Sequence, residues 1–323
     1  MRRRISILLC ACLLVGAVAV FAGCTPGNVT TADNNGTTIV VTSPAAHALV
    51  RPLTQNYMED GGTSVVTVVP LYKPGQDSHS FEPTAKDIIS LAGADVVVCT
   101  GSETWLDSSL KASGNNVARV VSMMEACDVT AADHDHDHDH DHDNEDACGL
   151  INGDEHVWLS VENAIRIVTK ITEALAEADR DSATIWEGHA TAYTAELEAL
   201  ASEYRALAET AIRDTVVIAD RHPFVYLFHD LGLTCVAAFP GCSSETSASF
   251  ETQMKLIEAV RAAGIPYVFV IEGSDAKVAG VVATETGAEI LTLNSLQIVS
   301  DYELSSYVEI MRGNLENLRK ALQ

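Results

Sequence analysis

The chain has 323 residues, of which 47% are hydrophobic and 20% charged, enough apolar material for one large domain or two lobes. Its formal net charge at pH 7 is -25. Such a surface repels nucleic-acid phosphates and anionic lipid headgroups, and it raises the local concentration of cations. We therefore expect no nucleic-acid partner.

The amino terminus has the features of a secretory signal. Three arginines at positions 2–4 precede an apolar stretch over residues 5–21, which is short for a membrane span but right for a signal peptide. Ala22, Gly23 and Cys24 then resemble a bacterial lipobox, in which the cysteine is diacylated. The alternative is an ordinary signal peptide that ends near a cysteine. A lipid on Cys24 would anchor the protein to the outer face of the bacterial cell membrane.

The remaining chain alternates strand and helix patterns twice. Short β-branched runs predict strands at 39–42, 65–70, 95–99 and 117–121, and again at 215–219, 235–238, 267–271 and 290–293. Helical patterns separate them at 46–58, 84–92 and 105–111, and then at 223–230, 247–263, 276–286 and 305–322. This alternation predicts α/β lobes, each a doubly wound parallel sheet covered by helices.

Two further helices, predicted over 161–178 and 181–213, lie between the halves. Apolar residues recur along one face of the second helix from Trp186 to Ala211, which predicts a packing seam. We therefore predict two lobes joined by a long helix, with the ligand site in the crevice between them at the carboxyl ends of the strands. The predicted segments are a signal peptide (1–23), a tether (24–38), an N-terminal lobe (39–160), a helical linker (161–213) and a C-terminal lobe (214–323).

Five consecutive His-Asp dipeptides occupy residues 134–143, within a loop over 128–150 that we expect to be disordered. Imidazole is a common protein ligand for zinc, and the alternating carboxylates attract cations. A solvated acidic loop without function is the alternative, and an affinity tag is disfavoured because the tract is internal. The tract therefore predicts accessory metal binding by His134, His136, His138, His140 and His142.

Cysteine spacing indicates no structural zinc site, since none of the cysteines after Cys24 is part of a C-x-x-C motif. Cys127 and Cys148 bracket the His-Asp tract, and Cys235 and Cys242 flank a turn. Two local disulfides would fit these spacings outside the cytoplasm.

Two segments carry a family resemblance. Residues 74–84 read PGQDSHSFEPT, which resembles the PGxDPHxxEPTPxD signature of the zinc and manganese substrate-binding proteins of ABC importers. Residues 154–159 read DEHVWL and look like that family's DPHxWLDPxNA segment. The resemblance runs from about residue 39 to the carboxyl terminus. The His-Asp tract lies immediately before the second segment, as the His-rich loop does in the zinc-importing branch.

The resemblance implies that His79 and His156 are metal ligands. His79 follows a predicted strand and His156 precedes a predicted helix, so both rings can face the crevice. A solute receptor must hold a divalent ion and release it again, which suits neutral imidazoles from both lobes. Zn2+ is the expected cargo, with Mn2+ as the alternative.

The C-terminal lobe departs from the family pattern at the next ligand. The family usually reads HDAFGYF, and aligning Phe224 and Tyr226 with it puts Arg221 at the histidine position. Arginine stays protonated and cannot ligate zinc. His222 could supply a third imidazole from a shifted backbone, or it could cap the helix expected from Pro223.

The fourth ligand is also open. Many members have an aspartate after the last strand, where this chain has Asn294. Glu272 directly follows the predicted strand 267–271 and is the better oxygen donor, although it could equally cap the next helix.

The function that the resemblance implies is a monomeric, lipid-anchored receptor without catalysis, which hands a divalent metal ion to an ABC permease. One alternative is a zinc-sequestering or adhesive surface protein, in which the tract matters most. Another is a metalloenzyme, because three histidines around an open zinc position also describe catalytic sites. The chain has no H-E-x-x-H helix to support that reading.

Deleting residues 134–143 should remove weak zinc sites from a calorimetric titration and leave the tight site, because alternating His and Asp residues have no apolar face on which to fold. Growth of the deletion strain should slow only when zinc is scarce. If the tight site disappeared as well, the tract would hold primary ligands.

Overall fold

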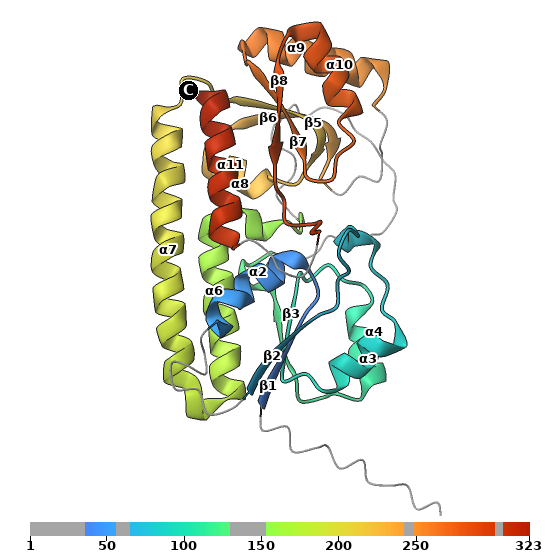
Figure 1. The fold of residues 1–323 in the computed structure, drawn as a ribbon, viewed down its shortest axis with the longest axis vertical. Coiled ribbons are helices and arrows are strands. Elements are labelled where there is room, and N and C mark those ends of the chain that lie inside the picture. Colours follow the sequence, from blue (N-terminus) through green and yellow to red (C-terminus); the bar gives the residue numbers. More distant parts are fainter. Residues whose placement is uncertain (1–35, 56–64, 130–152, 242–247, 301–305) are drawn as a thin grey trace, which may run out of the picture. The chain divides into compact units, whose positions relative to one another are not determined.

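Two four-stranded parallel sheets form the framework (Figure 1). The computed structural model describes residues 36–55, 65–129, 153–241, 248–300 and 306–323. The first sheet contains β1 (Gly36–Val41), β2 (Val65–Pro70), β3 (Val96–Cys99) and β4 (Arg119–Ser122), in the order β2-β1-β3-β4. The second contains β5 (Thr215–His222), β6 (Thr234–Pro240), β7 (Tyr267–Ile271) and β8 (Glu289–Leu293), in the order β6-β5-β7-β8. The second lobe thus repeats the strand order of the first.

This strand order determines where a ligand can bind. In the first sheet, β2 pairs with one edge of β1 and β3 with the other edge. In the second sheet, β6 and β7 flank β5 in the same way, so the strand order reverses between β1 and β3 and between β5 and β7. Open parallel sheets bind ligands beyond the carboxyl ends of the strands at such a reversal.

The described residues contain ten α-helices. They are α2 (Pro44–Thr54), α3 (Ala85–Ala92), α4 (Leu106–Ser113), α5 (Met123–Ala126), α6 (Val161–Ala178), α7 (Ala183–Thr210), α8 (Val225–Asp230), α9 (Phe250–Ala263), α10 (Lys277–Thr286) and α11 (Tyr307–Leu322). Short 3-10 turns occur at η1 (Ser78–Ser80), η2 (Val157–Leu159) and η3 (Arg180–Ser182). The Ser160 side chain caps α6, and Ser306 and Glu309 form a capping box at α11, which explains where these helices begin.

Successive side chains of a strand point to opposite faces of its sheet. In the central strands, residues on the two faces enter different cores, so both faces are covered. In β1, Ile39 and Val41 enter a core with α2, α6 and α7, whereas Val40 enters a smaller core under α3 and α4. In β5, Ile218 enters the former core and Val217 a separate one with α9 and α10. The predicted fold class, two doubly wound lobes joined by a long helix, is confirmed.

One hydrophobic core extends through both lobes. It combines the inner faces of both sheets with α6, α7 and α11, and α7 runs alongside both lobes (Figure 1). The predicted seam on α7 is confirmed, since Trp186, Tyr193, Leu197 and Leu200 are all buried there. Residues 36–323 consequently form one compact unit, and the predicted boundaries of 39–160, 161–213 and 214–323 stay predictions.

Strand β5 is longer than predicted. The expected strand over 215–219 continues to His222, because pairing with β6 resumes at Arg221 and Phe239 after a register shift that follows Ile218. The next helix begins at Val225 and not at Pro223. A bulge of this kind redirects the side chains that follow it.

Some predictions concern residues outside the described part of the chain. These are Cys24, the signal and tether, the His-Asp tract, Cys148 and Cys242. Cys127 and Cys235 are buried. Within the described residues, no helix has the length and apolar character needed to cross a membrane.

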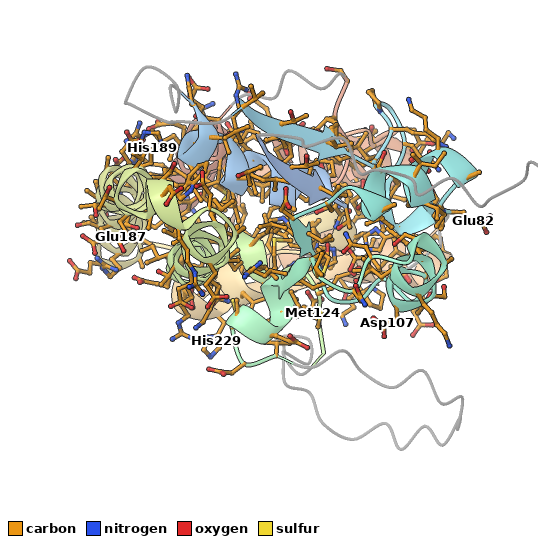
Figure 2. All side chains as sticks on the ribbon, turned by 90° about the horizontal axis from the view of Figure 1, so that it is seen from below. Glu82, Asp107, Met124, Glu187, His189 and His229 are labelled. Atoms are coloured by element: carbon orange, nitrogen blue, oxygen red, sulfur yellow. The ribbon has the colours of Figure 1, made fainter. Side chains whose placement is uncertain are left out.

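Histidines on helices play packing or surface roles. His189 Nδ1 lies 2.6 Å from the carbonyl oxygen of Leu53, and His229 is exposed on α8 (Figure 2). His47, on α2, lies with its Nδ1 2.7 Å from the hydroxyl of Tyr72. Burial, with a contribution from the charge of Arg51, lowers the pKa of His47 from 6.5 to about 4.

Acidification from pH 6.5 to about 4 should lower the free energy of unfolding, because the unfolded chain then binds a proton that the folded His47 excludes. Replacing His47 by Gln should weaken this dependence, and His229→Gln should leave it unchanged. Denaturant titrations at a series of pH values measure the slope. Equal slopes for the two variants would contradict the assignment.

Candidate metal site

His79 is held by an aspartate two residues before it. It lies in η1, on the connection between β2 and α3. One oxygen of Asp77, Oδ1, accepts a hydrogen bond from the His79 backbone N–H at 3.1 Å and lies 2.7 Å from His79 Nδ1. A carboxylate only accepts, so Nδ1 carries a proton, and Nε2 is the nitrogen left to bind a metal ion.

His156 has the same arrangement. Asp154 Oδ1 accepts from the His156 backbone N–H at 2.9 Å and lies 2.9 Å from His156 Nδ1. The His156 side chain is fully buried. A carboxylate behind each imidazole orients its ring and strengthens it as a ligand. Each of the two Asp-x-His segments therefore directs one ring nitrogen, Nε2, toward a metal ion.

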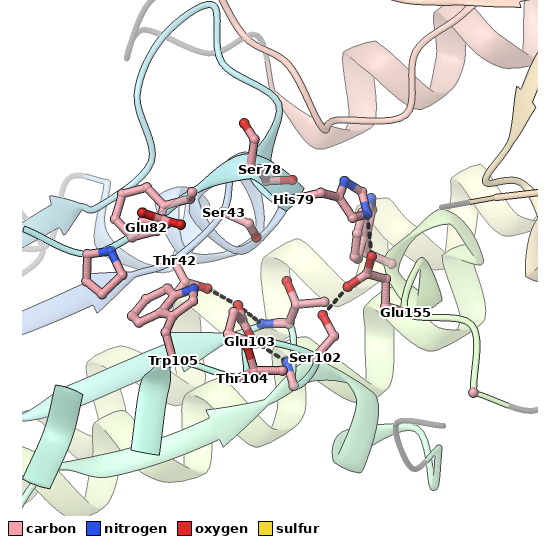
Figure 3. Close-up of a pocket in the computed structure, with 17 residues that line it drawn as sticks. Thr42, Ser43, Ser78, His79, Glu82, Ser102, Glu103, Thr104, Trp105 and Glu155 are labelled. Carbon is pink, nitrogen blue, oxygen red and sulfur yellow. Dashed lines mark hydrogen bonds and ion pairs between the residues drawn. The ribbon is translucent and has the colours of Figure 1, made fainter. Parts of the chain in front are cut away.

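Glu155 contacts His79 and lies close to His156. Its Oε1 contacts His79 Nε2, and its Oε2 accepts a hydrogen bond from Ser102 Oγ, at the end of β3 (Figure 3). The ring centroids of His79 and His156 are 5.6 Å apart. One ligand atom from each of these three residues lies within 4.8 Å of the other two. Two nitrogens and an oxygen at this spacing can hold a divalent cation.

Both carboxylates around His79 are ionised at neutral pH. Burial raises the pKa of Glu155, but hydrogen bonding and charge from His79, with His156 and Ser102, outweigh it and lower the pKa to about 2. Burial likewise opposes ionisation of Asp77, yet the bonds to His79 and Arg221 hold its pKa well below the usual range. The site therefore presents negative charge to a cation.

The segment that carries His156 is fastened to the C-terminal lobe. The Tyr226 hydroxyl donates to the Asp154 carbonyl at 2.8 Å, and Trp158 Nε1 donates to the Ser295 carbonyl at 2.9 Å. The Tyr307 hydroxyl donates to the Trp158 carbonyl at 2.7 Å. His79, in contrast, lies on a loop that follows a strand of the first sheet. The three donors, His79, Glu155 and His156, therefore lie where the two lobes meet.

Glu272 shapes the loop that follows β8. Its carboxylate accepts hydrogen bonds from Ser295 N and Oγ, both at 2.7 Å, and from Gln297 N at 3.0 Å. Burial raises the pKa of Glu272, against the effect of these bonds. The loop so held presents Gln297, whose amide nitrogen contacts His156 Nε2. Gln297 Oε1 is buried and has no hydrogen-bond partner among the described residues.

His222 and Arg221 diverge after the bulge in β5. The His222 ring is buried and stacked on Phe228, with a centroid distance of 5.2 Å, and neither ring nitrogen has a hydrogen-bond partner among the described residues. Burial lowers the pKa of His222 to about 4, so the ring is neutral. Arg221 instead donates from Nη2 to Asp77 Oδ2 at 3.0 Å.

A cavity of about 1100 Å³ opens beside His79 and Glu155. Figure 3 shows these two side chains pointing toward each other at one end and Trp105 and Glu82 at the other. The cavity also borders Gly153, the first described residue after the His-Asp tract. The described chain therefore resumes next to the candidate metal site after the gap that contains the tract.

The structure brings together His79 and His156, the two ligands predicted from the sequence. It does not place His222 or Glu272 in the same group of donors within the described residues. It adds Glu155 and Gln297, which the sequence analysis missed. Glu155 had a signal, because it directly precedes His156, whereas Gln297 had none.

The fold and the site define a class. Two α/β lobes with mixed nitrogen and oxygen donors at the crevice are the architecture of an extracytoplasmic solute-binding protein for a metal ion. The family model described as zinc-uptake complex component A, periplasmic, matches residues 39–321. The chain belongs to this family of uptake components, and it is not an enzyme.

Relatives agree with this assignment. The high-affinity zinc uptake system protein ZnuA of Bacillus subtilis is 33% identical over 254 residues, covering 76% of this chain and 77% of that protein. A putative metal-binding protein of Treponema pallidum is 30% identical over 315 residues, covering 95% and 94%. The crystal structure of the metal-dependent lipoprotein YcdH from Bacillus subtilis has a TM-score of 0.68 at 26% identity, covering 88% of this chain and 99% of that chain.

Replacing Gly241 by Ala should weaken metal binding. A Cβ at Gly241 would lie 2.9 Å from Asp154 Oδ2, 3.2 Å from the His222 carbonyl oxygen and 3.6 Å from His156 Cε1, so the Asp154 carboxylate must shift relative to the imidazole it orients. Loss of such a partner typically costs about 10- to 100-fold in affinity. Zinc titration of Gly241→Ala measures this loss, and Gly188→Ala, with open space around its Cβ, is the control. Equal affinities would contradict the role of this close approach.

Proposed function

We propose that this protein captures one divalent metal ion, Zn2+ in preference to Mn2+, outside the cytoplasm and delivers it to an ABC permease. The observation that supports this most directly is the group of His79, Glu155 and His156 at the junction of the lobes. Transport requires release as well as capture, and neutral imidazoles backed by carboxylates bind an ion without trapping it in a closed four-ligand cage. The three protein donors leave a position for a donor from the opposite lobe.

The proposed ligand atoms are His79 Nε2, His156 Nε2 and a carboxylate oxygen of Glu155. Gln297, from the C-terminal lobe, contacts His156 Nε2, and rotation of its amide would turn the unpartnered Oε1 toward the ion. Ligation by His222 or Glu272 stays a prediction. X-ray absorption at the metal edge distinguishes these sets, because it counts two imidazoles for His79 and His156 and three if His222 also binds.

The choice of metal follows from the donors. The two imidazoles favour zinc, and the five histidines of the His-Asp tract add to that preference. Each oxygen donor beside the two imidazoles makes the site more suitable for manganese. Elemental analysis of the purified mature domain, followed by competition between zinc and manganese, decides between them.

The anchor and the partner are parts of the same proposal. The lipobox-like sequence ending at Cys24, and the description of the related YcdH as a lipoprotein, support a lipid on Cys24. The protein would then act as a monomer on the outer face of the cell membrane, next to its permease. Metabolic labelling with a radioactive fatty acid, compared between the wild type and Cys24→Ala, tests the anchor.

Replacing both His79 and His156 by Ala should abolish tight zinc binding, because two of the three clustered donors are removed. Calorimetric titration of the mature domain measures the loss, and the paired control is His189→Ala with His229→Ala, which removes two imidazoles elsewhere. The ligand variant should still unfold cooperatively, since most of the core lies away from the site. Unchanged zinc affinity in the His79 and His156 double variant would refute the proposed site.

A further inference from the structure

An ion pair crosses between the lobes beside the proposed metal site. Arg221, at the end of β5, donates from Nη2 to Asp77 Oδ2 at 3.0 Å, although 144 positions separate the two residues in sequence. Their side chains are 20% and 23% exposed, so water only partly screens the pair. The two lobes are therefore joined by a well-shielded charged contact.

Asp77 makes a different contact with each of its two oxygens. Oδ2 accepts from Arg221, and Oδ1 accepts from the backbone of His79 and lies 2.7 Å from His79 Nδ1. A carboxylate is planar, so fixing one oxygen also fixes the direction of the other. The guanidinium of one lobe consequently determines how the imidazole of the other lobe is held.

The backbone of β5 is shaped to place this arginine. The register shift between Ile218 and Arg221 turns the Arg221 side chain toward Asp77, while His222 turns into the core. Asp220 Oδ1 accepts from the Arg221 backbone N–H at 2.8 Å, and Asp220 Oδ2 accepts from the Ser274 hydroxyl. These bonds fasten the base of the Arg221 side chain to the loop after β7.

We propose that Arg221 is a positioning residue for metal capture. By holding Asp77 from the opposite lobe, it sets the direction in which His79 presents Nε2, and it makes that direction depend on the approach of the lobes. The role of Arg221 in metal capture rests on the proposed function. The ordering of His79 by Arg221 is a separate property that can be measured without any metal.

A competing effect of Arg221 must be separated from this one. A positive charge near the site repels a divalent cation directly, and that repulsion does not need Asp77. The two effects have opposite signs when Arg221 is removed. Loss of positioning lowers the affinity, whereas loss of direct repulsion raises it.

A double-mutant cycle separates them. Asp77→Asn keeps an Oδ1 acceptor for His79 but replaces the acceptor Oδ2 by an amide that cannot accept from Arg221. We expect Arg221→Met to lower zinc affinity about tenfold when Asp77 is present and not to lower it further in Asp77→Asn. Arg221→Lys, which keeps the charge and a donor, should recover most of the affinity. Lys277→Met removes a positive charge that borders the same crevice as Arg221 and should change the affinity less than twofold.

The metal-free readout is the nitrogen NMR spectrum of the histidines. In the wild type, the Nδ1–H of His79 should give one sharp signal of a proton hydrogen-bonded to Asp77, and Arg221→Met should broaden or shift that signal while Lys277→Met leaves it unchanged. An unchanged His79 signal, or an Arg221→Met effect on affinity that is the same in the wild type and in the Asp77→Asn variant, would overturn the positioning role. If the wild type failed to bind zinc tightly while the His79 signal still responded to Arg221→Met, the proposed function would fail and the positioning would stand.

Discussion

The single apolar core that passes through both lobes is the constraint on which the other features depend. Because α6, α7 and α11 contribute to it together with the inner faces of both sheets, the carboxyl ends of the two sheets are held at a short, defined separation. Only at that separation can Gln297 contact His156 and Arg221 reach Asp77. A large opening of the crevice would have to separate packed surfaces within this core. The shared core therefore favours small adjustments at the site over wide motion of the lobes.

The proposed metal site combines a small number of donor side chains with carboxylates that orient them. Two Asp-x-His segments each give an imidazole its proton position and ring orientation before any ion arrives. The His-Asp tract contains the same residue types in another register, with a neighbouring aspartate on each side of a histidine and none two positions earlier. This difference agrees with a division between a preorganised tight site and a weak collecting segment.

Arg221 stands where the family has a histidine, and the residues around it compensate for this change. In the proposed site, an arginine at the position of the family's histidine removes a nitrogen donor, Glu155 offers an oxygen donor next to His156, and Arg221 itself binds Asp77. The donor set that we propose therefore shifts from nitrogen toward oxygen, while the contact between Arg221 and Asp77 still joins the two lobes. The Asp154 carboxylate lies close enough to the buried His222 to oppose the lowering of the His222 pKa by burial.

The sequence by itself determined the strands and helices, the two-lobed class, the family and the pair His79 and His156. Those features depend on periodicity and on short motifs, which are local properties of the chain. Tertiary structure alone decided the contacts of Gln297 with His156 and of Arg221 with Asp77, which join residues 141 and 144 positions apart. It also decided that His222 turns inward and Arg221 outward, because one register shift in β5 exchanges the faces that successive side chains occupy.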